Sequence, residues 1–579
     1  MTRKNAVAAA RGDQPFDLVL RDVQLINVFT AELSRSDIGI VGNLIAAVGP
    51  ANTLGAAHAV IEGNGCYAAP GFIDGHVHNE SSMCTPAQWA RVIVPKGTTT
   101  VLTDPHEIGN VLGLPGIRYM LEASEGLPYR YYVTASSCIP AVPSVETAGA
   151  TVTDKEMEEM LAWDRVMAVA EAMDYPGLIQ QSGNITPIVE AGHRREVPIE
   201  GHAPGVVDTQ LQAYLAAAGP RSSDHEAITT EEMLEKVRAG MMVYARASSY
   251  RDGTAEIAAA MNEVDDWRLF GFCTDDILPH DLLRMGHMEY GMRRLIDHGT
   301  DPVRVIQMAT INVAAHYGLH GIGAIAPGWL ADLVLLDDLE SVSVTNVIVD
   351  GKLIVAGGEW QVEVEEPVPP LMEHTVHLQA LSVDGFLPSF PLREGKVRVN
   401  AIDASQLFTS LTSIELDVED GKLLLPLPAD ISMAAIVPRH GQKSPPSLAF
   451  LSGYPLRGGA IASTIAHDSH NLAIIGKTPE AMLAAAHAIH EMQGGLVAVE
   501  GIEVLASVLL PIAGLMSAEP VPVIAEQLEG FINALPQLGL TAEFPLPLVA
   551  LALPVIPEVR LSDKGIVNVA TQQLIPMIP

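Results

Sequence analysis

The chain has 579 residues, of which 48% are hydrophobic and 18% are charged, and its formal net charge is −35. This length exceeds one hydrophobic core, so two or three domains are expected, and the composition excludes a disordered protein. The acidic balance argues against nucleic acid or an anionic membrane as a partner, because both are bound through basic patches. We expect a protein that acts on a small molecule.

The first residues and the cysteines indicate the compartment. Residues 1–15 are predicted to form a polar tail, without the apolar core of a signal peptide. The chain lacks a run of roughly 20 apolar residues that could span a membrane. The four cysteines form no C-x-x-C pair, so neither a disulfide framework nor a thiolate zinc site is expected. These features predict a cytoplasmic protein.

The chain begins with a β-rich pattern. Residues 16–69 contain short apolar runs separated by Gly, Asn and Asp, which is typical of strands and tight turns. The same pattern returns after residue 330. We therefore expect residues 16–69 and 320–362 to form one composite β-sandwich domain, into which the intervening segment is inserted.

Between residues 70 and 319, strand patterns alternate with helix patterns. The expected strands lie near residues 72–78, 98–103, 131–135, 166–171, 198–202, 222–226, 241–245 and 269–276. Repeated units of this kind predict a parallel sheet, either closed as a (β/α)8 barrel or open and doubly wound. Polar residues follow many of these strands. We favour the barrel, because its strand ends converge on one face, whereas an open sheet would spread them along an edge.

Two further segments complete the chain. Residues 363–370 are acidic and rich in Pro, which predicts a linker. Residues 371–579 are predicted to form an α+β domain of ordinary size, with a clear helix that opens at Thr478.

The first chemical signal is His76-Val77-His78, at the end of an apolar strand. In an extended strand, residues two apart point the same way, so both imidazoles project together. Such a pair can hold one divalent metal ion. A surface pair of histidines at a strand end is the alternative.

The other expected strand ends supply enough donors for more than one ion. The predicted metal ligands are His76, His78, Glu171, His202, His225 and Asp275. One ion would not need six such ligands, whereas two ions bridged by a carboxylate and a hydroxide would. Glu171 is the expected bridge, since its two oxygens can each face one ion. The set contains nitrogen and oxygen only, which permits manganese, iron, zinc or nickel.

This ligand pattern resembles the amidohydrolase superfamily, and within it the bacterial adenine deaminase family. The barrel motifs that carry the closer resemblance are residues 71–83, 97–100, 104–108 and 273–276. The motifs of the distal domain are residues 439–441, 458–464, 466–471 and 511–517. The resemblance extends from about residue 16 to the end of the chain. Asn79 departs from the pattern, because an apolar residue is expected there.

The resemblance implies a hydrolase acting on the carbon–nitrogen bond of a cyclic amidine, in purine salvage. A metal-bridged hydroxide would convert adenine to hypoxanthine and ammonia, with Asp275 transferring the proton. It implies two divalent ions per subunit, Mn²⁺ or Fe²⁺ with Zn²⁺ as another option, and a homo-oligomer, taken to be a dimer. The acid for the purine ring would be Glu107 or His106. Glu80, His280 and Asp276 are expected on the substrate side.

Other functions stay open at this point. A second hydrolase of the same superfamily, cleaving a cyclic amide or an N-acyl group, is the main alternative. Its cyclic-amide members typically need a carbamylated lysine, and no lysine lies near Glu171 in the sequence. Deaminases of the cytidine type are excluded by the missing H-x-E and P-C-x-x-C motifs. A non-enzymatic metal-binding protein is a third hypothesis. For His467 and His470 we expect a turn or a lid beside the substrate rather than a metal site.

Overall fold

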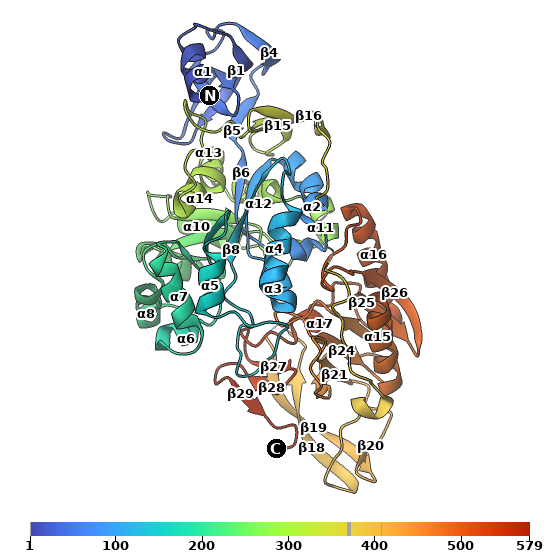
Figure 1. The fold of residues 1–579 in the computed structure, drawn as a ribbon. Coiled ribbons are helices and arrows are strands. Elements are labelled where there is room, and N and C mark those ends of the chain that lie inside the picture. Colours follow the sequence, from blue (N-terminus) through green and yellow to red (C-terminus); the bar gives the residue numbers. More distant parts are fainter. Residues whose placement is uncertain (1, 368–371, 407) are drawn as a thin grey trace.

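The computed structural model describes residues 2–367, 372–406 and 408–579. Three regions follow one another in space (Figure 1): a β-rich region that holds the N terminus, a central α/β region, and a second β-rich region that holds the C terminus. The central region connects the other two. The fold is therefore mixed α/β, as expected from the sequence.

In the described part of the chain, the central region is built on eight parallel strands. They are β6 (Phe72–Val77), β7 (Thr98–Thr103), β8 (Arg130–Ala135), β9 (Val166–Ala172), β10 (Ile199–Gly201), β11 (Ser223–Asp224), β12 (Met242–Arg246) and β13 (Phe270–Cys273). Strands β6 to β10 pair in order, as do β11 to β13. Parallel bridges between Ile199 and Ser222 and between Val77 and Asp275 join the two groups at both edges. The sheet is closed, and the predicted (β/α)8 barrel is confirmed.

Helices follow the barrel strands. They are α2 (Pro86–Ile93), α3 (His106–Leu112), α4 (Leu114–Ala123), α5 (Asp154–Met160), α6 (Tyr175–Gln180), α7 (Ile185–Arg194), α8 (Asp208–Ala218), α9 (Thr230–Arg238), α10 (Thr254–Met261), α11 (Pro279–Arg284), α12 (Met288–Asp297), α13 (Pro302–Gln307) and α14 (Val313–Tyr317). Thr153 and Glu156 form a capping box at the start of α5. Inside the barrel, a Cβ on Gly75 would lie 2.5 Å from the Tyr244 ring, so glycine is required next to His76.

The N-terminal sheet draws its strands from two separate parts of the chain. Its members are β1 (Phe16–Asn27), β2 (Glu32–Val41), β3 (Leu44–Pro50), β4 (Ala57–Glu62), β5 (Tyr67–Pro70), β14 (Leu333–Leu336), β15 (Val344–Val349), β16 (Lys352–Ala356) and β17 (Glu359–Trp360). Strand β5 pairs with β14, which brings both parts into one sheet. The exact domain boundaries stay predictions.

The start of the chain is more ordered than a tail. Residues Thr2–Ala10 form helix α1, which packs on β3. Ala6 and Ala9 are buried against the apolar face of the sheet. The small side chains that make this segment look featureless in sequence allow the helix to approach the sheet closely.

The predicted linker lies partly outside the described residues, which exclude 368–370. Its first part contacts the barrel. Glu366 accepts hydrogen bonds from Thr85 Oγ1 at 2.6 Å and from Gln88 Nε2 at 2.9 Å, and Val364 is buried. Residues 363–367 are thus held against α2.

The C-terminal region is the predicted α+β domain. Its large sheet contains β18 (Glu394–Asp403), β19 (Ser410–Glu419), β20 (Lys422–Leu423), β21 (Ile431–Val437), β22 (Ser447–Ser452), β23 (Ala460–Ser463), β24 (Leu472–Gly476), β25 (Gly495–Glu500) and β26 (Glu503–Leu509). Its other elements are α15 (Pro479–Met492), α16 (Val521–Ala534), α17 (Leu546–Ala550), β27 (Val559–Ser562), β28 (Gly565–Asn568) and β29 (Gln573–Ile575). Asn471 Nδ2 donates to Thr147 O at 2.8 Å, and Ser517 N donates to Met83 O at 2.9 Å. This domain therefore contacts the loops that follow the barrel strands.

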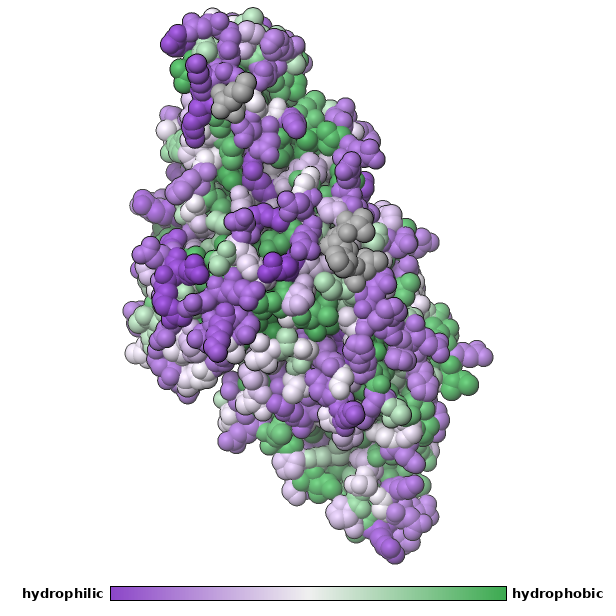
Figure 2. Space-filling view, in the orientation of Figure 1, coloured by the Kyte–Doolittle hydropathy of each residue, from purple (hydrophilic) through white to green (hydrophobic). Residues whose placement is uncertain are grey.

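The visible surface is mostly polar. Hydrophilic residues cover most of the visible face, with small apolar areas between them (Figure 2). Within residues 2–367, 372–406 and 408–579, every helix is too short or too polar to cross a membrane.

Candidate active site

Two histidines at the end of β6 begin the site. His76 and His78 are buried, and their Nε2 atoms lie 3.2 Å apart. His78 Nδ1 lies 2.9 Å from the carbonyl oxygen of Asp104 and donates to it. That hydrogen bond places the proton of a neutral imidazole on Nδ1, so Nε2 keeps a free lone pair. The His-x-His motif has the arrangement expected of a ligand pair.

Glu171, at the end of β9, lies between two pairs of histidines. Its Oε1 is 3.2 Å from His76 Nε2 and 3.1 Å from His78 Nε2. Its Oε2 is 2.8 Å from His202 Nδ1 and 3.5 Å from His225 Nε2. Each oxygen of this carboxylate therefore faces a different pair, as required of a bridging ligand.

Asp275 completes the first group of donors. It follows β13, and its Oδ1 lies 3.4 Å from His76 Nε2 and 3.1 Å from His78 Nε2. Its other oxygen, Oδ2, is 2.5 Å from the guanidinium of Arg246. Arg246 is buried at the end of β12, so one oxygen of Asp275 is held in place while the other faces the histidines.

The spacing of these donors fits divalent metal ions. Ligand atoms about 2.1 Å from one ion lie about 3.0 to 3.4 Å from each other. The separations around His76, His78, Asp275 Oδ1 and Glu171 Oε1 run from 3.1 to 3.4 Å. His202, His225 and Glu171 Oε2 form a second, looser group. All six predicted ligands are brought together in two groups that share Glu171.

The electrostatics of the site also favour a bound divalent cation. Burial alone lowers the pKa of His76, but the charge of Glu171 and the hydrogen bond to Asp275 raise it to about 9. Burial alone raises the pKa of Glu171, yet the surrounding histidines hold it well below its usual range. Carboxylates that attract protons to imidazoles also attract a divalent cation, which can replace those protons.

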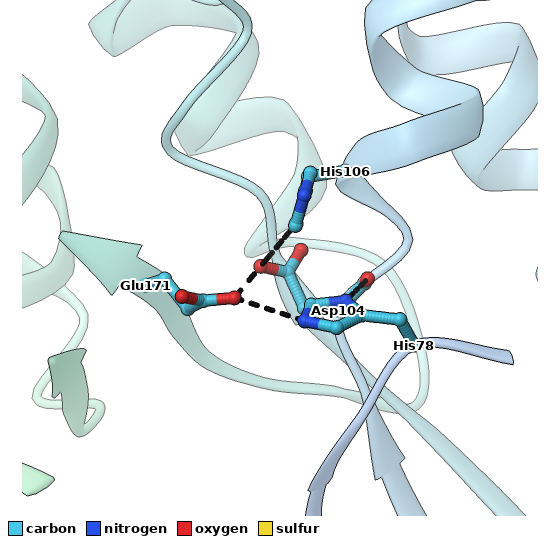
Figure 3. A group of neighbouring side chains, drawn as sticks. All are labelled: His78, Asp104, His106 and Glu171. Atoms are coloured by element: carbon cyan, nitrogen blue, oxygen red, sulfur yellow. Dashed lines mark hydrogen bonds and ion pairs between the residues drawn. The ribbon is translucent and has the colours of Figure 1, made fainter. Parts of the chain in front are cut away.

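A cavity of about 440 Å³ is lined by five of the six donors, which are His78, Glu171, His202, His225 and Asp275. The cavity is also lined by His106, Glu107 and Asp276, three residues predicted from the sequence to act on the substrate. Figure 3 shows His78, which follows β6, and His106, at the start of α3, both near Glu171, with Asp104 between them. A cavity of this size can hold a small molecule beside the candidate metal ligands.

Comparisons with known proteins agree with this geometry. Residues 67–354 match the model of the amidohydrolase family, and residues 406–573 match that of the adenine deaminase C-terminal domain. An adenine deaminase from Desulfatibacillum aliphaticivorans is 38% identical over 98% of both chains. One from Methanothrix thermoacetophila is 38% identical over 100% of both chains. The chain belongs to the adenine deaminase family. The resemblance seen in the sequence is confirmed.

Two of the residues expected on the substrate side, Glu80 and His280, do not line the cavity. Glu80 is fully buried behind Glu107 and does not line the described cavity. Burial, with a smaller contribution from the nearby carboxyl of Glu107, raises the pKa of Glu80 to about 8. His280 lies on α11, with Nε2 3.6 Å from Asp281, and is also absent from the cavity lining. Because neither residue lines this cavity, a substrate contact for Glu80 or His280 stays a prediction.

The C-terminal domain of this family member supplies cavity residues that the sequence did not assign to catalysis. His467 and Asp468 line the cavity, and His467 Nδ1 lies 3.6 Å from Glu107 Oε1. His470 is buried and does not line the described cavity. The prediction of a segment beside the substrate fits His467. The sequence analysis did not identify Arg246 as a partner of Asp275, because a single arginine at the end of an apolar strand is not part of a recognisable motif.

Proposed function

We propose that this member of the adenine deaminase family hydrolyses adenine to hypoxanthine and ammonia. The observation that supports the proposal most strongly is the position of the Glu171 carboxylate. Its two oxygens face two separate histidine pairs in a pocket of suitable size. Manganese or iron, with zinc as another option, would be held by His76, His78 and Asp275 on one side and His202 and His225 on the other. Bound there, divalent cations supply Lewis-acid chemistry that activates a water molecule.

Asp275 is proposed to move the proton of the reaction. As water adds to C6 of adenine, Oδ1 takes a proton from it and returns that proton to the departing amino nitrogen. The Arg246 guanidinium, 2.5 Å from Oδ2, keeps the carboxylate oriented during both transfers. The overall reaction consumes one water and releases one ammonia for each adenine.

Glu107 is proposed to hold a proton against the purine ring. It lines the cavity, and burial raises the pKa of its carboxyl above the ordinary value. A protonated carboxyl can donate to a ring nitrogen as water adds to the ring. The other candidate, His106, has Nδ1 3.1 Å from Asp104 and Nε2 3.5 Å from Asp468, so both ring nitrogens already face carboxylates. Asp276 accepts from Ser81 Oγ at 2.5 Å and lines the cavity, which suits contact with the substrate.

A direct assay tests the proposal. Protein loaded with Mn²⁺ or Fe²⁺ should shift the ultraviolet absorbance of adenine to that of hypoxanthine and release an equal amount of ammonia. Removal of the metal with a chelator should abolish the reaction, and readdition should restore it. If adenine stays unchanged while a cyclic amide or an N-acyl amino acid is hydrolysed, the proposed substrate is wrong.

The assembly and the location of the enzyme also belong to this proposal. We expect a homodimer in the cytoplasm that binds neither nucleic acid nor membrane. The acidic net charge of −35 supports only the last of these points, because it opposes contact with anionic surfaces. Light scattering of the purified protein would test the dimer.

A further inference from the structure

A second group of buried donors lies where the barrel meets the C-terminal domain. We propose that His106, Cys138 and Asp468 form a further site for a divalent cation, separate from the two histidine pairs. One donor atom from each of these residues lies within 4.8 Å of the others. His106 Nε2 is 3.5 Å from Asp468 Oδ1, and each of the three residues is at most 3% exposed.

The imidazole of His106 is oriented as a metal ligand would be. Its Nδ1 lies 3.1 Å from Asp104 Oδ2, and the other oxygen of Asp104 accepts from Ser136 Oγ at 2.6 Å. A carboxylate on Nδ1 keeps the proton there and leaves the lone pair on Nε2, which is the usual support for a metal-bound histidine. That Nε2 faces Asp468.

The two segments that carry His106 and Cys138 are also held together by hydrogen bonds. Asn110 Nδ2 donates to the carbonyl oxygen of His106 at 2.9 Å and to that of Cys138 at 3.0 Å. One side chain thus fixes both backbones that carry donors. Such rigid support is what a preformed ligand set requires.

Asp468 provides an independent indication. Its Oδ2 is buried and has no hydrogen-bond partner among the described residues. A buried carboxylate oxygen without a partner costs free energy, because it has lost its water. A cation bound between Asp468, His106 and Cys138 would remove this cost.

A neighbouring group with similar residues does not qualify. Glu107, His467 and His470 also place donor atoms within 4.8 Å of one another. However, the backbone N–H of Ala466 donates to His470 Nδ1 at 3.2 Å. A neutral imidazole that accepts at Nδ1 carries its proton on Nε2, so His470 has no lone pair left for an ion.

The donor types predict the ion. Thiolate, imidazole and carboxylate together favour Zn²⁺ or Fe²⁺ over Mg²⁺ or Ca²⁺. Three protein ligands leave a fourth position open, and His106 and Asp468 both line the cavity. Because Asp468 belongs to the C-terminal domain, the ion would fasten that domain to the barrel. This thiolate site departs from the sequence-based expectation that the cysteines bind no metal.

Cobalt substitution tests the site directly. The donors of the two histidine pairs are nitrogen and oxygen only, so a thiolate-to-Co²⁺ charge-transfer band in the near ultraviolet would report a cysteine ligand. Protein reconstituted with Co²⁺ should show this band and bind three ions per subunit. Cys138→Ser should lose the band and bind two. Cys84→Ser, which alters another buried cysteine, should keep the charge-transfer band and bind three cobalt ions.

A second variant tests the site in case Cys138→Ser does not fold. Asp468→Asn keeps the thiol and the size of the side chain, and it should weaken cobalt binding at the band-forming site at least tenfold. Absence of the band in the parent protein, or its persistence in Cys138→Ser, would overturn the proposal. The band is read without adenine, so the result is independent of the deaminase assay.

Discussion

Lys236 Nζ lies 2.8 Å from Asp224 Oδ2, and both side chains are fully buried in the barrel wall. The same ammonium donates to the carbonyl oxygen of Ala203 at 2.7 Å, while Asp224 Oδ1 accepts from the N–H of Ala203 at 2.9 Å. Ala203 follows His202, and Asp224 precedes His225. One buried ion pair therefore positions both histidines of the second ligand group.

Replacing Lys236 by Met should weaken that second group. Two carboxylates, Asp224 and Glu232, would lose their cation, and breaking a buried pair costs about 3 to 5 kcal/mol. We expect a lower free energy of unfolding and earlier loss of the ion held by His202 and His225 during dialysis. Denaturant titration and metal analysis would measure both. Lys155→Met, on an exposed helix position, is the control and should change neither.

Glu171→Gln should lower metal content and activity together. An amide offers one neutral oxygen where the bridge needs two that carry charge, so we expect at least about a 100-fold loss of kcat. The matched control is Glu200→Gln, which alters another buried glutamate that pairs with His316 instead. Full metal content in the Glu171 variant would show that the bridge is assigned to the wrong residue.

Glu107→Gln and Glu80→Gln should separate the two candidate acids. Glu107 lines the cavity, and loss of its acidic proton should lower kcat about 100-fold with little change in KM. Glu80 lies behind it, so its variant should stay within about tenfold of the parent. Steady-state kinetics with adenine decides between them. Equal losses of kcat would contradict direct donation by Glu107.

Glu146→Gln should make stability less dependent on pH. Burial raises the pKa of Glu146 well above its ordinary value, and one of its carboxyl oxygens has no partner in the described structure. The folded state then holds a proton that the unfolded state has already lost, so stability falls as pH rises from the unfolded toward the folded pKa. Each tenfold difference in proton affinity between the two states corresponds to about 1.4 kcal/mol of stability.

The variant should therefore unfold at higher temperature than the parent at pH 8 and at nearly the same temperature at pH 4. Thermal unfolding followed by circular dichroism at both values checks this. A difference of equal size at both pH values would point to packing rather than to titration. Glu158→Gln serves as the control, because the Glu158 side chain is 45% exposed and pairs with Arg194 at the surface.

Much of the site could be read from local patterns. His76 and His78 share a direction because a strand alternates its side chains, and that rule holds wherever the strand lies. Glu171, His202, His225 and Asp275 each follow a recognisable strand, and parallel strands in a closed barrel open on one face. The barrel, and the gathering of these six side chains at one place, could thus be predicted without coordinates.

Other relationships depend on residues far apart in the chain. Glu80 and His280 carry suitable chemistry, yet neither lines the described cavity, and no local sequence pattern reveals which residues do. Asp468 reaches His106 across a domain junction, at a separation of more than 300 residues. Such contacts follow from how two domains pack against each other.

The amino-acid sequence by itself determined the strand–helix alternation, the family resemblance and the candidate ligands, because side-chain direction and motifs are properties of short segments. Only the tertiary structure decided which oxygen of Glu171 faces which histidines, that Arg246 holds Asp275, and that the distal domain helps to line the pocket. Those are distances between separate elements, and they are set by the packing of the whole chain rather than by any one stretch of it.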